Sequence, residues 1–407
     1  MFFYFWRNAY VLFTGNVRAG QPGIRDPRDL RVRPQKKGQI CADKVFDFSL
    51  GNPSVPTPQA VTDAMIDILS TAEPTAVHGY TSGAGDMACR TAIAEDLNAR
   101  YNCGADPALI YMTCGAAAAL CCSFCALATE DADEFIAFAP FFPEYRVFCD
   151  TNGGKLVQVM MRENDFQIDL SLLDAAVNER TKGVVINSPN NPCGVVYTEE
   201  TIRGLAAYLE KKQAEYGHPI YLITDEPYRE LVYGGAVVPF VPNYYDNTIV
   251  CYSYSKSLSL PGERIGYALV SPKAADAKAV YAAICGAGRA LGYVCAPSLM
   301  QHVITRCAGV QPNLAPYEEN RRILLEGLTG AGFTCVNPDG AFYLFMKSPE
   351  PDAHAFAAKA KEHELLVVPC DSFGCPGYVR IGYCVSKETI EGSLPGFAAL
   401  AKEYGLS

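Results

Sequence analysis

Residues 251–267 read CYSYSKSLSLPGERIGY and place Lys256 directly after an apolar run that predicts a buried strand. Ser253 and Ser255 precede this lysine, and Arg264 follows it eight residues later. A lone lysine at such a position is most often a solvated charge at a strand end. Two hydroxyl groups and a guanidinium are, however, what a phosphate monoester needs, because arginine gives it bidentate charge-assisted hydrogen bonds. The stretch therefore predicts a phosphate site at the end of a buried strand.

The sequence on either side of this stretch alternates between short apolar runs and helical patterns. Runs that are apolar at successive positions predict strands buried on both faces, as in a parallel sheet. Apolar residues at helical spacing between them predict helices, which gives βαβ units with right-handed crossovers. Ligands of such a sheet bind outside the carboxyl ends of its strands. The predicted strands are 134–140, 182–189, 219–227, 248–255 and 264–272, and two of the predicted helices are 86–101 and 201–216.

The two ends of the chain differ from this pattern. Arg, Lys, Pro and Gly residues dominate much of residues 1–42, so we expect a poorly ordered segment there. Beyond about residue 300, a long helical pattern at 317–332 is followed by three predicted short strands and a terminal helix. We therefore predict an α/β fold with a second, smaller α+β domain.

Composition restricts the partners and the compartment. A length of 407 residues suits two domains, and a formal net charge of −10 argues against nucleic acid as a partner. The apolar opening run is interrupted by Arg7 and Asn8 and is too short to span a membrane.

The 17 cysteines are scattered through apolar runs, which predicts free thiols in a reducing cytoplasm. Cys122 and Cys125 have zinc spacing but lack further ligands, so we predict no metal site.

Other polar or small residues lie where predicted strands end. Asp225 ends one strand and Tyr228 follows it, although an isolated aspartate there is usually a helix cap or a turn former. Asn191 and Gly194 lie in the run NSPNNPCG, which by itself predicts a plain turn. Gly115 opens a run of small residues at the start of a predicted helix, where free N–H groups and the helix dipole favour an anion.

Taken in their order along the chain, these motifs resemble those of the class I/II aminotransferases, which use pyridoxal phosphate. The run Ser-x-Ser-Lys followed by arginine is similar to the family's cofactor-lysine signature. The resemblance extends from about residue 45 to the C-terminus and leaves residues 1–42 outside. It implies the fold type I of PLP-transferases, with a mostly parallel seven-stranded sheet in a large domain at 73–299. Residues 43–72 and 300–407 would form the small domain.

The resemblance also implies how the cofactor is held. Lys256 would carry it as a Schiff base, while Asp225 would pair with the pyridine nitrogen. Asn191 and Tyr228 would bond the phenolic oxygen. The phosphate would be bound by Gly115, Ala116, Ala117, Ser253, Ser255 and Arg264, and Phe142 would stack on the ring.

Three more residues would bind the substrate or the partner subunit. Arg380 lies in a strand-like run where a lone charge would be costly unless it is paired. In the family this arginine binds the substrate α-carboxylate, with Gly51 and Asn191 beside it. Tyr80 is otherwise a plain surface tyrosine, but the resemblance implies that it reaches the phosphate of a neighbouring subunit. The chain would then be a homodimer with active sites at the interface.

These assignments predict a cytoplasmic aminotransferase of amino acid metabolism and biosynthesis. It would move an amino group from an L-amino acid to 2-oxoglutarate or pyruvate by a ping-pong mechanism, with Lys256 acting as nucleophile and then as proton carrier. Arg289 favours an acidic substrate side chain, whereas the residues around Tyr293, Cys295 and Pro297 would admit an apolar or aromatic one, so the substrate stays open.

The same residues are compatible with two other functions. A C–S lyase or a related enzyme that forms a carbanion at Cα shares the fold. A non-catalytic sensor would need a DNA-binding head, for which residues 1–42 are too short and too irregular.

Overall fold

Seven apolar segments form one sheet at the centre of the chain, in the order β2–β8–β7–β6–β5–β3–β4. The computed structural model describes residues 45–130 and 132–406, so the prediction for residues 1–42 lies outside the described part. All five predicted strands are present, and the predicted mostly parallel, seven-stranded sheet is confirmed. Only β8 is antiparallel to its neighbours β2 and β7. The strands are β2 (Ile110–Thr113), β3 (Glu134–Ala139), β4 (Lys155–Met160), β5 (Thr181–Asn187), β6 (Tyr221–Asp225), β7 (Thr248–Ser253) and β8 (Gly266–Val270).

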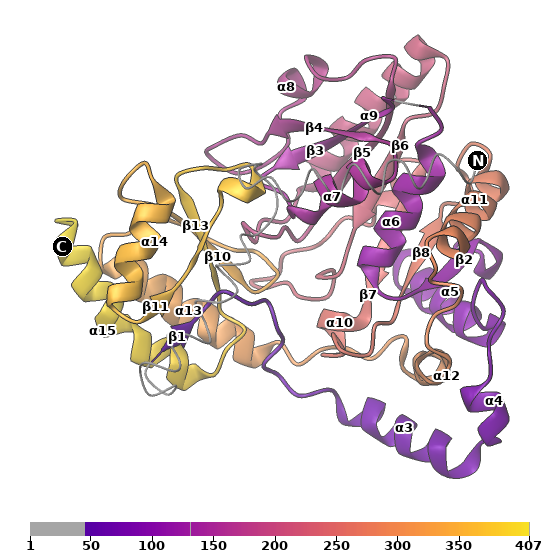
Figure 1. Cartoon of the computed structure of the whole chain (residues 1–407), viewed down its shortest axis with the longest axis horizontal. Coiled ribbons are helices and arrows are strands. Elements are labelled where there is room, and N and C mark those ends of the chain that lie inside the picture. The colour runs from indigo at the N-terminus through magenta and orange to yellow at the C-terminus, as the bar shows by residue number, and fades with distance from the viewer. Residues whose placement is uncertain (1–44, 131, 407) are drawn as a thin grey trace.

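Helices cover both faces of this sheet, because its strands carry apolar side chains on successive positions (Figure 1). Ile249 and Cys251 of β7 pack on one face, while Val250 and Tyr252 pack on the other. The first face is covered by α6 (Ala116–Leu127), α7 (Glu144–Thr151) and α11 (Ala277–Ala290). The second is covered by α5 (Met87–Tyr101) and α12 (Ser298–Cys307), and towards β4 by α8 (Leu170–Asp174) and α9 (Glu199–Tyr216).

Both predicted helices are confirmed: α5 begins one residue after its predicted start and α9 two residues before it. Asp86 caps α5, its side chain accepting a hydrogen bond from the Cys89 N–H, and α5 ends at Asn102 in the left-handed conformation. Thr198 caps α9 in the same way, and Gly217 ends it. None of the helices in the described part of the chain combines the length and the apolarity needed to cross a bilayer.

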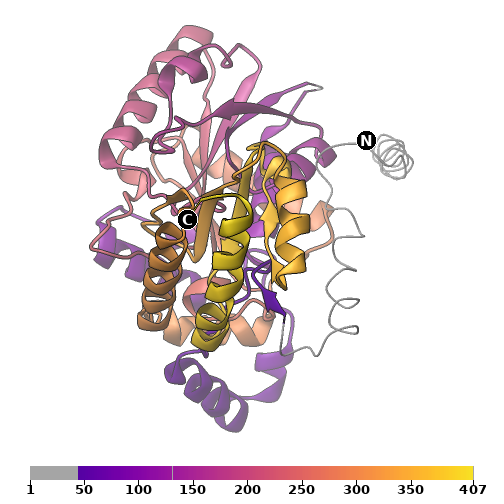
Figure 2. The ribbon, with the colours of Figure 1, turned by 90° about the vertical axis from the view of Figure 1, so that its left-hand side faces the viewer.

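The C-terminal part has its own antiparallel sheet, in the order β12–β13–β10–β9, and its own apolar core. Figure 2 shows that α13, α14 and α15 lie side by side over this part. The sequence predicted three short strands and a terminal helix here, but the structure has five strands and the additional helix α14. Three of the five strands are two-residue segments, too short to leave a pattern in the sequence. The elements are α13 (Ala315–Gly330), β9 (Cys335–Val336), β10 (Tyr343–Lys347), α14 (Ala353–Glu362), β11 (Leu365–Leu366), β12 (Val368–Pro369), β13 (Tyr378–Gly382) and α15 (Lys387–Glu403).

The segment that enters from the N-terminal side contacts both parts. Its strand β1 (Phe46–Asp47) pairs with β11, whereas α3 (Gln59–Thr71) buries Val61 and Ile68 among residues of α5 and α12. The short helix α4 (Pro74–His78) follows. The boundaries predicted at residues 73 and 300 stay a prediction.

A tight turn after β5 joins the two parts. The carbonyl of Gly194 accepts hydrogen bonds from the N–H groups of Asp339 and Gly340, both at 2.9 Å. Gly194 has a φ of +73°, and a Cβ atom there would lie 2.4 Å from Cβ of Pro338. The glycine predicted for this turn is therefore required both by its backbone conformation and by the close approach of the C-terminal part.

Replacing Gly194 with alanine should destabilise the protein more than the same change at Gly235, which has a φ of +80° but open space around it. Both changes place a side chain in the left-handed region, at about 1 kcal/mol. Only G194A adds a steric overlap, for a total of about 2 to 4 kcal/mol. Denaturant unfolding of the two variants measures the difference, and equal losses would contradict the packing role of Gly194.

Candidate active site

Lys256 lies in the one-turn helix α10 (Tyr254–Ser257), which directly follows β7. The Ser253 side chain caps this helix by accepting a hydrogen bond from the Ser255 N–H at 3.2 Å. The Lys256 Nζ donates to the carbonyl of Gly51 at 2.6 Å. Burial lowers the pKa of Lys256 from 10.5 to about 8, and the charges of Arg380 and Arg264 act in the same direction. A neutral amine is therefore accessible near physiological pH, as a nucleophile or a base requires.

Asp225 ends β6 and is buried. Its Oδ2 accepts a hydrogen bond from the Tyr145 hydroxyl at 2.5 Å, while its Oδ1 is buried and has no hydrogen-bond partner. Burial raises the pKa of Asp225 to about 7, against the effect of the Tyr145 hydrogen bond. Because a buried acceptor without a partner is costly, Oδ1 is suited to a donor from a ligand.

Arg380 enters the same region from β13 of the C-terminal part and is buried. Its Nη1 donates to Oδ1 of Asn191 at 3.0 Å, and its Nη2 donates to the carbonyl of Ser49 at 2.9 Å. The guanidinium carbon lies 4.5 Å from the ring centroid of Tyr343 and 5.1 Å from that of Phe373. All these partners are formally neutral, so the positive charge remains available to a carboxylate.

Donors for an anion converge at the start of α6. Gly115 caps this helix with a φ of +87°, and a Cβ atom there would lie 2.9 Å from Nη2 of Arg264. Arg264 is oriented by donating to the carbonyls of Cys114 and Pro261, at 3.1 and 3.0 Å. The hydroxyl groups of Ser253 and Ser255 lie 2.7 Å apart. A helix N-terminus, a guanidinium and hydroxyl groups are together a phosphate-binding set.

One cleft of about 310 Å³ brings nearly all the predicted residues together. Gly115 is not among the lining residues but immediately precedes two of them. Tyr80 is 94% exposed and does not line the cleft, and neither does the exposed Arg289 at the end of α11. Tyr293 and Cys295 line a separate small hollow. The predicted residues that line the cleft are Gly51, Ala116, Ala117, Phe142, Asn191, Asp225, Tyr228, Ser253, Ser255, Lys256, Arg264 and Arg380.

The sequence did not identify several residues that complete the site. The Tyr343 hydroxyl lies 3.0 Å from that of Tyr228, and Asn187 accepts a hydrogen bond from the Asn191 N–H at 2.7 Å. Tyr145 lies behind Asp225, three residues after Phe142, without a motif to mark it. In the described residues no cluster of three or more His, Cys, Asp or Glu side chains could hold a metal ion.

Comparison with known proteins identifies the family. The model for aminotransferase class I and II matches residues 43–394. The chain belongs to this family. It is 30% identical over 365 residues to an aspartate aminotransferase of Thermotoga maritima, covering 88% of this chain and 91% of the relative. It is similar to a crystal structure of an amino transferase from Eubacterium rectale, with 50% identity, a TM-score of 0.92 and 98% of both chains covered.

A crystal structure of the Thermotoga maritima aspartate aminotransferase matches with a TM-score of 0.82 at 28% identity, over 92% of this chain and 97% of that one. These relatives confirm the predicted family, the fold type I of PLP-transferases and the enzyme class. They also confirm the predicted dependence on pyridoxal phosphate. The class I and II aminotransferase described here is thus a PLP-dependent enzyme, and the roles of its individual residues are taken up below.

The raised pKa of Asp225 predicts a specific pH dependence of stability in the cofactor-free aminotransferase. The folded protein keeps Asp225 protonated up to a pH of about 7, whereas the unfolded chain loses this proton near 3.8. The contribution of this group to stability is therefore lost as the pH rises through that range and is constant above it. An Asp225→Asn variant has no ionisable group at this position, so it cannot lose this contribution as the pH rises.

The melting temperature of the variant, minus that of the wild type, should thus increase from about pH 5 to about pH 7 and level off above about pH 8. Calorimetry on the cofactor-free proteins measures this. With the cofactor bound, a cationic partner at Oδ1 would favour the carboxylate and abolish or reverse the trend. A difference independent of pH in the cofactor-free proteins would contradict the raised pKa.

Proposed function

We propose that this aminotransferase moves an amino group from an L-amino acid to 2-oxoglutarate or pyruvate in two half-reactions, with the cofactor attached covalently to Lys256. The observation that carries the proposal is that Lys256, Arg380 and Asp225, whose Oδ1 has no hydrogen-bond partner, line one cleft. A role in amino acid biosynthesis stays a prediction.

Pyridoxal phosphate fits the donors and acceptors of the cleft. Oδ1 of Asp225 would accept the N–H of the protonated pyridine ring, which relieves its unsatisfied state. Asn191 and Tyr228 would bond the phenolic oxygen, and Phe142 would pack on the ring. Ser253, Ser255, Arg264 and the start of α6 at Gly115, Ala116 and Ala117 would hold the phosphate. When bound, the cofactor supplies an electron sink for the carbanion at the substrate Cα.

Arg380 and Lys256 would act on the substrate from different sides of the cleft. The guanidinium would bind the α-carboxylate, with Asn191 already bonded to it and Gly51 nearby. A carboxylate fixed in this way limits how the Cα–H bond can point. Lys256, with a pKa lowered to about 8 by burial, would take the proton from Cα and return it to the cofactor side.

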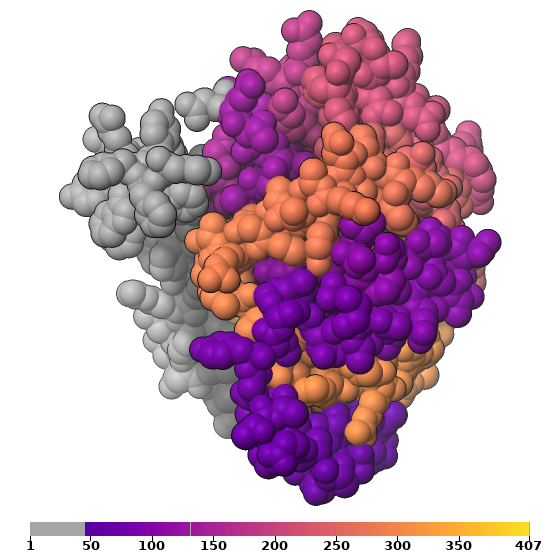
Figure 3. All heavy atoms as spheres, turned by 90° about the vertical axis from the view of Figure 1, so that its right-hand side faces the viewer, coloured from indigo at the N-terminus to yellow at the C-terminus, as the bar shows by residue number. Residues whose placement is uncertain are grey.

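We further propose a homodimer whose interface includes the face shown in Figure 3. In the middle and lower part of this face, the indigo segment that contains α3, α4 and α5 lies beside the orange segment that contains α11 and α12. Large apolar side chains are exposed on or beside these elements: Ile66, Leu69, Met87 and Val294, along with Tyr80. Exposed apolar residues that come from neighbouring elements favour a protein contact. Tyr80 would then reach the partner's phosphate instead of its own.

We also propose that the enzyme works in the cytoplasm. The 16 cysteines in the described part of the chain are all free thiols, ten of them buried. Thiols of this kind persist in a reducing compartment. The free thiols are therefore compatible with a cytoplasmic location, and this compatibility supports the proposal.

The half-reaction with an amino acid alone tests the proposed function. The purified aminotransferase should absorb near about 420 nm and shift towards about 330 nm when a donor L-amino acid is added without an oxo acid. Lys256→Ala should bind the cofactor, lose the shift and lose turnover by at least about 10³-fold, because no other neutral amine lines the described cleft.

A spectrum that returns to its start while ammonia accumulates would instead indicate a lyase. Turnover in Lys256→Ala close to that of the wild type would overturn the assignment of the lysine. The amino acids that cause the shift define the donor class.

A further inference from the structure

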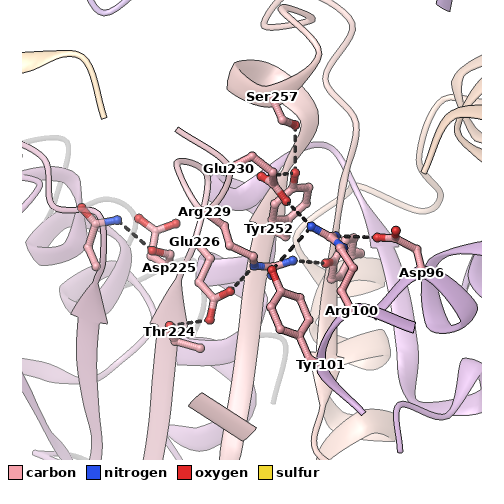
Figure 4. Close-up of polar contacts among 12 residues, drawn as sticks. Asp96, Arg100, Tyr101, Thr224, Asp225, Glu226, Arg229, Glu230, Tyr252 and Ser257 are labelled. Carbon is pink, nitrogen blue, oxygen red and sulfur yellow. Dashed lines mark hydrogen bonds and ion pairs between the residues drawn. The ribbon is translucent and has the colours of Figure 1, made fainter. Parts of the chain in front are cut away.

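A buried polar network lies behind the cleft, on the side of the sheet that faces α5 (Figure 4). Two of its members directly follow site residues in the sequence. Glu226 follows Asp225, and Ser257 follows Lys256. Neither of these two network residues lines the cleft.

The centre of the network is a fully buried ion pair. Nε of Arg229 donates to Glu226 at 2.5 Å, and its Nη1 donates to the Tyr267 hydroxyl at 3.3 Å. The guanidinium carbon lies 4.5 Å from the ring centroid of Tyr252 and 5.2 Å from that of Phe240. The cation therefore holds the Tyr252 ring in one place through a desolvated cation–π contact.

A directed chain of hydrogen bonds runs from α5 to α10. Nη1 of Arg100 donates to one oxygen of Glu230 at 3.1 Å, and the Tyr252 hydroxyl donates to the other at 2.8 Å. The Ser257 hydroxyl lies 2.8 Å from the same Tyr252 oxygen. Since a phenol has a single proton and this one goes to the carboxylate, Ser257 is the donor in the last bond. Ser257 is thus tied to α5 through a phenol and a carboxylate.

The helix that carries Lys256 depends on such tethers. It comprises four residues, and a single turn has too few internal hydrogen bonds to hold its own position. Ser253 and Ser255 at its start line the cleft, where the proposed phosphate site would use them. Ser257 at its end bonds away from the cleft. Ser257 is therefore a tether that does not depend on the cofactor, beside the backbone hydrogen bond from the Tyr254 N–H to the Ile265 carbonyl at 3.2 Å.

We propose that Tyr252 is a positioning residue for Lys256: its hydroxyl, held by Glu230, fixes the end of α10 through Ser257 and so keeps the amine in line with the cleft. This inference rests on the proposed role of Lys256. The groups that bind substrate and cofactor lie on other elements or at the start of α10. Loss of the tether should therefore slow the proton-transfer steps and leave substrate binding almost unchanged.

Tyr252→Phe tests this with the loss of one oxygen atom. The matched control is Tyr245→Phe, which removes the hydroxyl of another buried tyrosine. That hydroxyl donates to the Ile220 carbonyl at 2.6 Å, before the start of β6 and away from the cleft. In the holoenzyme, Y252F should lower kcat of the amino acid half-reaction by about tenfold or more, because small misplacements of a catalytic group cost factors of this size. KM should change by less than about twofold. Y245F should change neither constant, even where its melting temperature falls as much.

A double-mutant cycle with Ser257 removes the dependence on one variant. Ser257→Ala breaks the same bond, so the double variant should be no slower than the slower single variant. Ser257→Thr keeps the hydroxyl and should restore most of the rate. Additive losses, or a Y252F that matches Y245F, would overturn the positioning role. Lys256→Ala in the same assay separates the two proposals. If it is inactive, a negative result for Tyr252 overturns the positioning role alone. If it stays active, the proposed function itself is overturned.

Discussion

The burial of charge in one cleft is the constraint on which the rest of this structure depends. Lys256, Asp225 and Arg380 each carry an ionisable group away from water, and burial of such groups is unfavourable unless they find partners. The protein supplies part of these partners, in Tyr145 for Asp225 and in Asn191 for Arg380. Oδ1 of Asp225 is left without a hydrogen-bond partner, which is what the proposed binding of the cofactor requires. The seven-stranded sheet, the C-terminal sheet and the helices packed on them form the apolar surroundings of these groups.

Sequence and structure agree where a local pattern determines the element. Strands such as β6 and β7 are apolar on successive positions because helices cover both faces, and α5 and α9 begin at capping side chains that the sequence displays. The two-residue strands β9, β11 and β12 leave no such pattern, because they are defined by pairing with distant segments. The antiparallel direction of β8 is likewise set by pairing with β2 and β7 and by no periodicity.

The same division holds within the site. Lys256, Asn191 and Arg264 stand in recognisable motifs, and the structure brings them to one cleft. Tyr145 and Tyr343 could not be identified, since their relation to Asp225 and Tyr228 exists only after residues 80 and 115 positions apart have come together. Tyr252 is hidden for another reason. It reads as one more apolar residue of a buried strand, and only its hydroxyl, on the far face of the sheet, connects it to the lysine.

The bond between Arg380 and Asn191 joins a strand of the C-terminal part to the turn after β5, and the carbonyl of Gly194 ties that same turn to Asp339 and Gly340. The proposed carboxylate site is therefore assembled across the junction of the two parts, and an insertion or deletion in either loop would separate its residues. Leu120 of α6 and Glu144 of α7 also line the cleft but take no part in these bonds, so they can be exchanged while the site stays in register. A change at these two positions would alter the fit for a substrate side chain and leave the proposed contact with the α-carboxylate in place.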